Sequence, residues 1–357
     1  MIQSVQLTNF RNFTKKELSF SEKVTVIVGD NAVGKTNILE SVFLLATGKS
    51  FKAKVEDEMV RYESDVARVK GEILADEKTS LEIVLTDGEI KIGDVVQRAP
   101  KKKLLVNGVP RRLVDFAGNF TVVLFSPNDL ELVTESPSIR RKFLDTVLSQ
   151  TDREYRRSLL SYEKGVRQRN KILYNIREHG VSRSQLLFWN HLLIKNGDYI
   201  SQKRREFIDF VNEQKPLSDN IYSLEYDKSA ISEARLEQYR MEEVASATTL
   251  VGPHRDDVIF RISPTSQEAT LAARQLSVYG SRGEQRMGVL WLRMAELSYI
   301  EKTTDAKPTL LLDDIFSELD HIHRDVVMDV ITKNQTIITT PDPHYIEDIK
   351  GAKIIEL

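Results

Sequence analysis

Short apolar runs at the start of the chain predict strands at residues 2–10 and 23–29, the second a buried strand that ends in glycine. Residues 35–48 then carry apolar side chains at helical spacing, with Gly48 near the C-terminal end of the predicted helix. Between residues 67 and 125, five further short runs are separated by Asp-Gly, Gly-Asp and Asn-Gly pairs, which are typical of hairpins. These runs, the last of them "FTVVLF", predict a mostly antiparallel sheet.

The pattern becomes helical between Ser138 and about Gln214, after Ser136 and Pro137, which stand where a helix should begin. A polar stretch around Pro216 ends these helices, and strand patterns return near residues 248–262. A loop, a helix and strands at 308–314, 335–340 and 352–357 follow, with a second helix between the first two of these strands. We therefore expect one α/β domain, residues 1–135 and 247–357, split by a helical insertion at residues 136–246.

Composition limits the class of protein. The chain has 357 residues, 41% of them hydrophobic and 29% charged, as expected for a soluble globular protein with a sizeable core. It has no cysteine, which excludes disulfides and thiolate metal sites. The first residues lack the pattern of a signal peptide, and no apolar run approaches the ~18 residues of a membrane span. We expect a cytoplasmic protein with no membrane attachment.

The net charge of −2 conceals an uneven distribution. Residues 140–205 contain 16 Lys or Arg and only six Asp or Glu, so this segment is strongly basic and the remainder acidic. Residues 98–112 hold six basic residues and no acidic one. Local basic excess favours phosphate binding, whereas the competing interpretation is solvated surface charge.

A phosphate-binding motif follows the buried strand at 23–29. "GDNAVGKT" matches G-x-x-x-x-G-K-[ST] in full, with a strand before it and a helix directly after. In such a loop the backbone N–H groups and the helix N-terminus face a phosphate, Lys35 reaches the β- and γ-phosphates, and the Thr36 hydroxyl binds Mg²⁺. The predicted ATP-binding residues of this segment are Gly29, Asp30, Asn31, Ala32, Val33, Gly34, Lys35, Thr36 and Asn37.

The acidic partner of this loop is predicted at Asp313 and Asp314, directly after the buried strand "TLLL". Asp313 is expected to hold Mg²⁺ together with Thr36, and Asp314 to orient or deprotonate the attacking water, so that Lys35, Asp313 and Asp314 are the catalytic candidates. An apolar strand that ends in acids merely at the surface is the alternative. Lys35 and Asp313 lie 278 residues apart, a spacing typical of ABC-type chromosome-maintenance ATPases rather than small GTPases.

The sequence resembles the RecF family of bacterial recombination mediators nearly end to end. The resemblance rests on "LTNFRNF", "GDNAVGKTNILE", "LLATGKSF", "FSPNDLELVTESPSIRRKFLD", "GPHRDD", "YGSRGEQR" and "LLLDDIFSELD". It implies an ABC-type ATPase head: a P-loop lobe with a mixed sheet and an antiparallel β subdomain, and a helical second lobe. Ala32 stands where many such heads carry Gly, and Glu135 where the family often has Gly.

The resemblance assigns further roles. It implies an ABC signature near residues 279–286 that acts in trans on the partner's ATP, comprising Ser281, Arg282, Gly283, Glu284 and Gln285. The spacing of Ser281 and Glu284 also fits a simple helix capping box, and the two interpretations are compatible. The same resemblance implies a D-loop (Ser317, Asp320), a switch position (Thr339, with Thr340), an arginine near the nucleotide (Arg11) and a Q-loop residue (Asn128 or Asp129). The alternative for Arg11 is a surface arginine after an edge strand, and for Asn128 or Asp129 it is a turn with an N-terminal helix cap.

The resemblance also implies ATP and Mg²⁺ as cofactors and an ATP-dependent homodimer on double-stranded and gapped DNA. Hydrolysis is expected to be weak and DNA-stimulated, in a repair role that involves RecR and, indirectly, RecA. The predicted DNA-binding residues are Lys101, Lys102, Lys103, Arg111 and Arg112 on one hairpin, and Arg140 and Arg141 on a helix. His254 and Arg255 of "GPHRDD" are candidates for contact with nucleotide, DNA or the lobe interface, of which we favour the interface. A small-substrate P-loop kinase and a non-hydrolysing structural head are the alternative functions.

Overall fold

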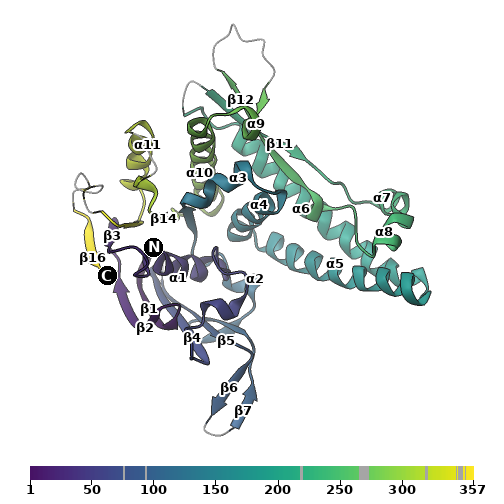
Figure 1. Cartoon of the computed structure of the whole chain (residues 1–357), viewed down its shortest axis with the longest axis horizontal. Coiled ribbons are helices and arrows are strands. Elements are labelled where there is room, and N and C mark those ends of the chain that lie inside the picture. The colour runs from purple at the N-terminus through teal and green to yellow at the C-terminus, as the bar shows by residue number, and fades with distance from the viewer. Residues whose placement is uncertain are drawn as a thin grey trace. The chain divides into compact units, whose positions relative to one another are not determined.

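The computed structural model describes residues 1–74, 77–92, 95–217, 220–264, 273–317, 321–342, 344, 349 and 351–357 (Figure 1). The chain forms two compact units. The first comprises Met1–Asn128 and Ile300–Leu357, and the second comprises Asp129–Tyr299. Among the described residues, no helix combines the length and the apolarity that crossing a membrane requires.

A six-stranded antiparallel sheet forms one layer of the first unit. Its strand order is β2-β1-β4-β5-β8-β9. The strands are β1 (Ile2–Phe10), β2 (Phe13–Ser19), β4 (Val66–Leu74), β5 (Lys78–Thr86), β8 (Lys102–Val106) and β9 (Val109–Arg111). Along β4 and β5 buried residues alternate with more exposed ones, so one face is covered and the other meets solvent. A short ribbon of β6 (Glu89–Ile92) and β7 (Val95–Arg98) follows β5.

A five-stranded parallel sheet forms the second layer of this unit. Its order is β10-β14-β15-β3-β16, built from β10 (Val122–Phe125), β14 (Thr309–Asp313), β15 (Thr336–Thr340), β3 (Val24–Val28) and β16 (Lys353–Glu356). The inclusion of "FTVVLF" in the antiparallel sheet is wrong, because β10 pairs in parallel with β14. All four residues of β10 are buried, a continuous pattern typical of parallel sheets covered on both faces.

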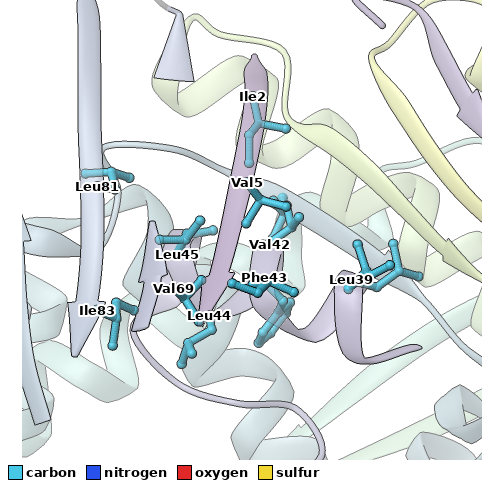
Figure 2. Packing of buried hydrophobic residues seen from close by; sticks show 14 of the residues in the cluster. Ile2, Val5, Leu39, Val42, Phe43, Leu44, Leu45, Val69, Leu81 and Ile83 are labelled. Atoms are coloured by element: carbon cyan, nitrogen blue, oxygen red, sulfur yellow. The ribbon is translucent and has the colours of Figure 1, made fainter. Parts of the chain in front are cut away.

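Helix α1 (Lys35–Thr47) packs between the two sheets. Eleven of its 13 residues are buried, so nearly every face of the helix is covered by the rest of the unit. Figure 2 shows Leu45 and Phe43 of this helix among Val5 of β1 and Val69 of β4, and the same buried cluster includes Leu311 of the parallel sheet. The helix ends at Gly48, whose φ of 68° is the left-handed conformation favoured for glycine. The phosphate-binding loop is thereby held on a helix that the core fixes on both sides.

The remaining elements of the first unit are short. They are α2 (Leu113–Phe116), α11 (His321–Ile331) and the 3₁₀ turns η1 (Glu56–Met59) and η5 (Ile315–Ser317). Turn η2 (Pro127–Leu130) lies where the first unit ends and the second begins.

Long helices dominate the second unit. After α3 (Glu131–Thr134) come α4 (Pro137–Thr151), α5 (Arg153–His179) and α6 (Leu187–Asn212), with η3 (Arg183–Leu186) between the last two. Helices α5 and α6 lie side by side (Figure 1). Helix α4 begins at Ser136 and Pro137, as predicted. Shorter helices α7 (Glu233–Gln238) and α8 (Arg240–Ser246) and the turn η4 (Pro253–Arg255) follow.

A small sheet completes the second unit and corrects the predicted organisation. It pairs β11 (Asn220–Asp227) with β12 (Asp257–Pro264) and β12 with β13 (Arg274–Gln275). The predicted insertion, 136–246, is therefore not all helical. Because β12 pairs with β11, and because Trp291 of α10 (Arg282–Thr304) stacks near Tyr222, residues 247–299 pack with the second unit rather than the first. The observed boundaries are 128/129 and 299/300 in place of 135/136 and 246/247.

Candidate nucleotide-binding site

The loop between β3 and α1 has the backbone that a phosphate cradle requires. Ala32 (φ 69°) and Gly34 (φ 113°) both take the left-handed conformation. Residues in this conformation let successive backbone N–H groups point into one concave site that can bind an anion. A Cβ at Gly34 would come within 2.7 Å of the Asn12 amide nitrogen, so only glycine fits there. Ala32 occupies a conformation that normally favours glycine, at a cost of roughly 1–2 kcal/mol. Strain of this kind is characteristic of ligand-binding sites.

The two reactive side chains of the loop are held by the loop and by the parallel sheet. Lys35 is buried, and its Nζ donates to the backbone carbonyls of Gly29 (2.6 Å) and Asp30 (2.8 Å). Thr36 Oγ1 donates to Asp313 Oδ1 at 2.9 Å. Asp313 Oδ1 also accepts from Thr339 Oγ1 at 2.8 Å, because β14 and β15 place these two residues opposite each other. Phosphate-binding, metal-binding and switch candidates therefore share one hydrogen-bond network.

This network fits Mg²⁺. A hydroxyl and a carboxylate oxygen side by side are hard oxygen ligands, and Mg²⁺ characteristically takes one or two protein ligands and completes its shell with waters and phosphate. Among the described residues there is no cluster of three or more acidic or histidine side chains that would form an all-protein metal cage. Thr36 and Asp313 thus suit a metal that arrives with a nucleotide.

Asp314 follows Asp313 in an unusual conformation. Its φ is 51°, and its backbone N–H points to the carbonyl oxygen (3.1 Å) and the hydroxyl (3.2 Å) of Thr339. The left-handed turn makes the side chain leave the strand in a different direction from that of an ordinary strand residue. A strained, positioned carboxylate next to a metal-type acid is the arrangement expected of a group that handles the attacking water.

Arg11 lies on the turn between β1 and β2 and pairs with α1. Its guanidinium makes a bidentate contact with Glu40, Nε to Oε2 at 2.8 Å and Nη2 to Oε1 at 2.6 Å, and Nη1 donates to the Glu58 carbonyl. The Glu40 side chain is fully buried and also accepts from Ser50. Arg11 is thus not the loose surface arginine of the alternative interpretation, and its contacts hold α1 one turn beyond Thr36.

Asn12 is a site residue that the sequence analysis missed. Its Nδ2 donates to the Val33 carbonyl at 2.8 Å, and its Oδ1 accepts from Asn37 Nδ2 at 2.9 Å. The side chain therefore ties the phosphate-binding loop to the first turn of α1. Only its position beside Arg11 in "FRNF" signalled this role.

The candidate signature segment lies in the second unit. Ser281 N–H donates to Glu284 Oε2 (2.8 Å) and Glu284 N–H donates to Ser281 Oγ (3.3 Å), so the predicted capping box is present at the start of α10. Gln285 Nε2 donates to the carbonyl of Gly280 and thereby fixes the turn after α9 (Leu276–Tyr279). A Cβ at Gly283 would meet nothing within 4 Å. Packing within the chain therefore does not explain this glycine, and the exposed Ser281 and Arg282 beside it form an open helix N-terminus.

The other residues assigned by resemblance have mixed outcomes. Ser317 ends η5, whereas Asp320 lies outside the described residues. Asn128 lies in η2, and Asp129 forms a bidentate ion pair with Arg293 of α10, at 2.6 and 3.0 Å. Arg293 also contacts Glu296, and burial raises the pKa of Glu296 to about 7 although Arg293 opposes this shift. Asp129 thus serves as an anchor of α10.

The hairpin of β8 and β9 presents its five basic residues in two ways. Lys101 pairs with Asp57 at 2.9 Å, and Lys102 pairs with Glu56 at 2.7 Å, a contact that holds the pKa of Glu56 below its usual value. Lys103, Arg111 and Arg112 are exposed. None of their three side chains makes a hydrogen bond or ion pair with another described residue. Of the five basic residues of this hairpin, these three are the ones whose side chains have no ion-pair partner in the described part of the chain.

Arg140 and Arg141 have partners inside the second unit. Arg140 makes a bidentate ion pair with Asp257 and donates to the carbonyls of Leu132 and Glu135. Arg141 donates to the Asp256 carbonyl at 2.7 Å, and burial lowers its pKa. Both guanidinium groups thereby link α4 to the start of β12, so we expect a structural role for them, and their DNA binding stays a prediction.

"GPHRDD" is part of the same packing. His254 Nδ1 lies 2.8 Å from the Tyr162 hydroxyl and Nε2 lies 3.0 Å from the Thr249 carbonyl. Burial lowers the pKa of His254 to about 4, so the ring is neutral at pH 7. Asp256, fully buried, pairs with Arg204 of α6 at 2.9 Å. These contacts give the motif a structural role in the second unit.

The loop, the acid at the end of β14 and the sheet between them define an ABC-type P-loop ATPase head. A family model described as "RecF/RecN/SMC N terminal domain" matches residues 1–355. The heads of SMC proteins share the fold alone, as in a Pyrococcus furiosus Smc head with 16% identity, a TM-score of 0.53, and coverage of 99% of this chain and 92% of that one.

Relatives named "DNA replication and repair protein RecF" match almost the whole chain. Those of Lachnoclostridium phytofermentans and Agathobacter rectalis are 35% and 33% identical, over 95% of this chain and 92% and 91% of theirs. That of Bacillus thuringiensis is 34% identical over all of this chain and 96% of its own. A solved structure described as the recombination mediator RecF with ATP has a TM-score of 0.85 at 29% identity, covering 99% of this chain and 95% of that one. The chain belongs to the RecF family, and these relatives do not favour a small-substrate kinase or a structural head.

Proposed function

We propose that this protein is an ATP-dependent DNA-binding protein of recombinational repair, a clamp that closes as a dimer when ATP binds. The observation that carries the proposal is the Thr36–Asp313–Thr339 network beneath a complete phosphate-binding loop. The names of the relatives, which refer to DNA replication, repair and the RecFOR pathway, supply the biological setting. We infer that it acts in the cytoplasm.

Within one chain, residues Gly29 to Asn37 bind the phosphates of ATP. Lys35 exchanges its present contacts with Gly29 and Asp30 for phosphate oxygens, which are stronger, charge-assisted acceptors. Thr36 and Asp313 hold Mg²⁺, which neutralises phosphate charge when it is bound. Arg11 and Asn12 keep α1 and the loop in register with the turn between β1 and β2.

The second half of the site belongs to another copy of the chain. Ser281 to Gln285 form a capped, open helix N-terminus, and such a terminus attracts anions through free N–H groups and the helix dipole. We infer that this segment binds the γ-phosphate held by the partner's loop. The unit of residues 1–128 and 300–357 then acts as the nucleotide lobe, and the unit of residues 129–299, which holds the segment, acts as the signature lobe. Ser317 and Asp320 act as the D-loop between subunits.

Hydrolysis opens the clamp. Asp314 orients the attacking water and accepts its proton, while Thr339 keeps Asp313 in place. Thr339 and Thr340 stand where ABC ATPases usually carry histidine, and a threonine hydroxyl is a much weaker base, which suits slow hydrolysis. We infer that DNA stimulates this weak reaction by stabilising the closed dimer. The clamp binds double-stranded and gapped DNA. There it recruits RecR and thereby promotes the loading of RecA.

Light scattering on the full chain tests this proposal. Lys35→Arg is expected to abolish both the ATP-dependent increase in mass and hydrolysis, because a planar guanidinium cannot replace the compact ammonium inside the loop. Lys49→Arg is the matched control, since Lys49 is exposed beyond the end of α1. Unchanged ATP-induced dimers of the Lys35→Arg variant, with ATP shown to be bound, are incompatible with the clamp.

A further inference from the structure

The register of the six-stranded sheet aligns cations that are far apart in the sequence. Residues directly opposite one another in an antiparallel sheet share a face. Starting from β2, the pairings run from Lys15 to Thr8, to Arg68, to Val84 and to Lys103. Arg112 is the next residue after β9 in extended backbone, so continuing the register of β8 and β9 by one step places it beside Lys103. We call Lys15, Arg68, Lys103 and Arg112 the cation row.

The cation row lies on the face of the sheet that the core does not cover. The residues next to it along each strand, Leu7, Val69, Ile83 and Leu104, are buried in the core on the opposite face. Because side chains alternate between faces, the row must point away from α1. All four cations of the row are exposed.

The charges of the row are largely uncompensated. Lys15, Lys103 and Arg112 make no ion pair with any described residue. Arg68 contacts Glu82 at 3.0 Å, and this pair is solvent-exposed, so it contributes little and can exchange partners. The adjacent cross-strand row, which holds Glu17, Lys70 and Glu82, mixes both signs. The cation row contains no acidic residue.

The dimensions of the row match a nucleic acid backbone. Neighbouring strands lie ~4.8 Å apart, so five strand spacings from Lys15 to Arg112 span roughly 24 Å. That length corresponds to about 7 base pairs at 3.4 Å each. A line of point charges on a β surface, without stacking aromatics or amide side chains arranged to read bases, suits a regular polyanion.

We propose that the outer face of this sheet binds the phosphate backbone of double-helical DNA through Lys15, Arg68, Lys103 and Arg112. This inference rests on the proposed function and assigns the surface that contacts DNA. It adds Lys15 and Arg68 to the predicted residues. It leaves out Lys102, which stands opposite the buried Leu85, and also Lys101 and Arg111, which lie outside the row in the sheet register. Because the contacts are to phosphate, binding is independent of base sequence and sensitive to salt.

The test is fluorescence anisotropy of a labelled ~30-base-pair duplex with the full chain and saturating ATP, across a salt series. The variant replaces all four row residues by Gln. Each lost phosphate contact lowers the slope of log K against log salt by about 0.9, so the slope is expected to fall by about 3 to 4. The affinity at ~100 mM salt is expected to fall at least tenfold. The matched control removes four exposed charges elsewhere, at Lys164, Lys195, Lys228 and Lys333.

The outcomes separate the two proposals. If the unmodified chain with ATP does not bind duplex DNA, the proposed function fails. If the unmodified chain binds and the row variant keeps both affinity and slope, the cation row is wrong and the proposed function stands. Binding of the row to anionic phosphatidylserine vesicles but not to duplex also overturns it. Should the fourfold variant lose its thermal transition, the pairs Lys15→Gln with Arg68→Gln and Lys103→Gln with Arg112→Gln serve instead, each with an expected slope change of about 2.

Discussion

Thr36 and Asp313 are separated by 277 residues in the chain, and their side chains are joined by a hydrogen bond of 2.9 Å. One residue opens α1 and the other closes β14, so the bond fastens the phosphate-binding loop to the centre of the parallel sheet. Thr339 of β15 donates to the same carboxylate oxygen. The fold therefore brings together the two side chains that we propose to hold Mg²⁺, without any contribution from a nucleotide.

Replacing Thr36 by Ala is expected to weaken Mg²⁺-dependent ATP binding at least tenfold, because the hydroxyl is one of two protein oxygens available to the metal. Loss of the bond to Asp313 also lowers the free energy of unfolding by about 1 kcal/mol. Titration with a fluorescent ATP analogue, with Mg²⁺ and with EDTA, measures the first effect. Thr36→Ser keeps the hydroxyl and should bind normally. Full Mg²⁺-dependent affinity in Thr36→Ala excludes this role.

Gly34 and Gly108 both have positive φ, so alanine variants of the two can distinguish a loss of stability from a loss of ATP binding. An alanine at Gly34 would approach the Asn12 amide to 2.7 Å, whereas one at Gly108 (φ 76°) would meet nothing within 4 Å. Gly108→Ala should cost about 1 kcal/mol of unfolding free energy, and Gly34→Ala should cost more, because its methyl group also meets Asn12. Only Gly34→Ala should also lose ATP affinity, by tenfold or more. Equal ATP affinity in the two variants contradicts the described loop.

Gly283 provides a prediction in which stability and function change in opposite directions. Alanine is the better helix former, and its Cβ would be unobstructed, so Gly283→Ala should raise the free energy of unfolding by up to about 1 kcal/mol. The same methyl group would stand where the partner's phosphate approaches, and ATP-dependent dimerisation should fall. Thermal unfolding and light scattering measure the two effects. A stabilised variant that dimerises as before argues against a ligand at this helix start.

His254 makes the stability of the chain depend on pH. Its pKa is about 4 in the folded state because burial disfavours the charged ring, against about 6.5 when unfolded. The unfolded state therefore binds more protons between these values, so the stabilisation is complete above pH 6.5 and is lost as the pH falls towards 4. Between pH 7 and 5 the contribution of this group falls by about 2 kcal/mol. Urea unfolding should show a smaller drop for His254→Gln, and an identical drop refutes the assignment.

Arg140 is predicted to stabilise the second unit rather than to bind DNA. Arg140→Gln removes a bidentate pair with Asp257 and should lower the free energy of unfolding by roughly 2 to 3 kcal/mol, since the carboxylate keeps fewer partners. The salt dependence of duplex binding should not change. Arg112→Gln is the contrasting variant, with little effect on stability and a slope change of about 0.9. If Arg140→Gln lowers the slope of log K for duplex binding against log salt, Arg140 contacts DNA and this prediction is wrong.

Local motifs made the nucleotide site predictable. "GDNAVGKT" and "TLLLDD" have side chains whose chemistry needs one arrangement, and in the structure Thr36 and Asp313 are joined by a hydrogen bond. Their binding of Mg²⁺ stays a prediction. The capping box could also be predicted from the sequence, because Ser281 and Glu284 interact within one helical turn. Asn12 was missed because its partners, Val33 and Asn37, lie on another element.

Long-range pairing set the limits of the sequence prediction. β10 reads as one more hairpin strand until its parallel pairing with β14, nearly 190 residues on, is known. The alternating Tyr222, Leu224 and Tyr226 of β11 were a strand signal inside a helical segment, and pairing with β12 moved the domain boundary. A basic count also cannot distinguish Arg140, which has an internal partner, from Lys103, which has none among the described residues. The cation row could not be predicted either, because its residues lie on separate strands and only the register of strand pairing aligns them.

The central claim, that each ATP site is shared by two chains, is tested most directly by mixing two inactive variants. Lys35→Arg disables the phosphate-binding loop and keeps an intact signature segment, while Ser281→Arg does the opposite. ATP hydrolysis with DNA should be absent for each variant alone and should return on mixing, because a mixed dimer contains one intact composite site. Full activity of Ser281→Arg alone, or no recovery when mixed dimers are shown to form, would contradict a site completed in trans.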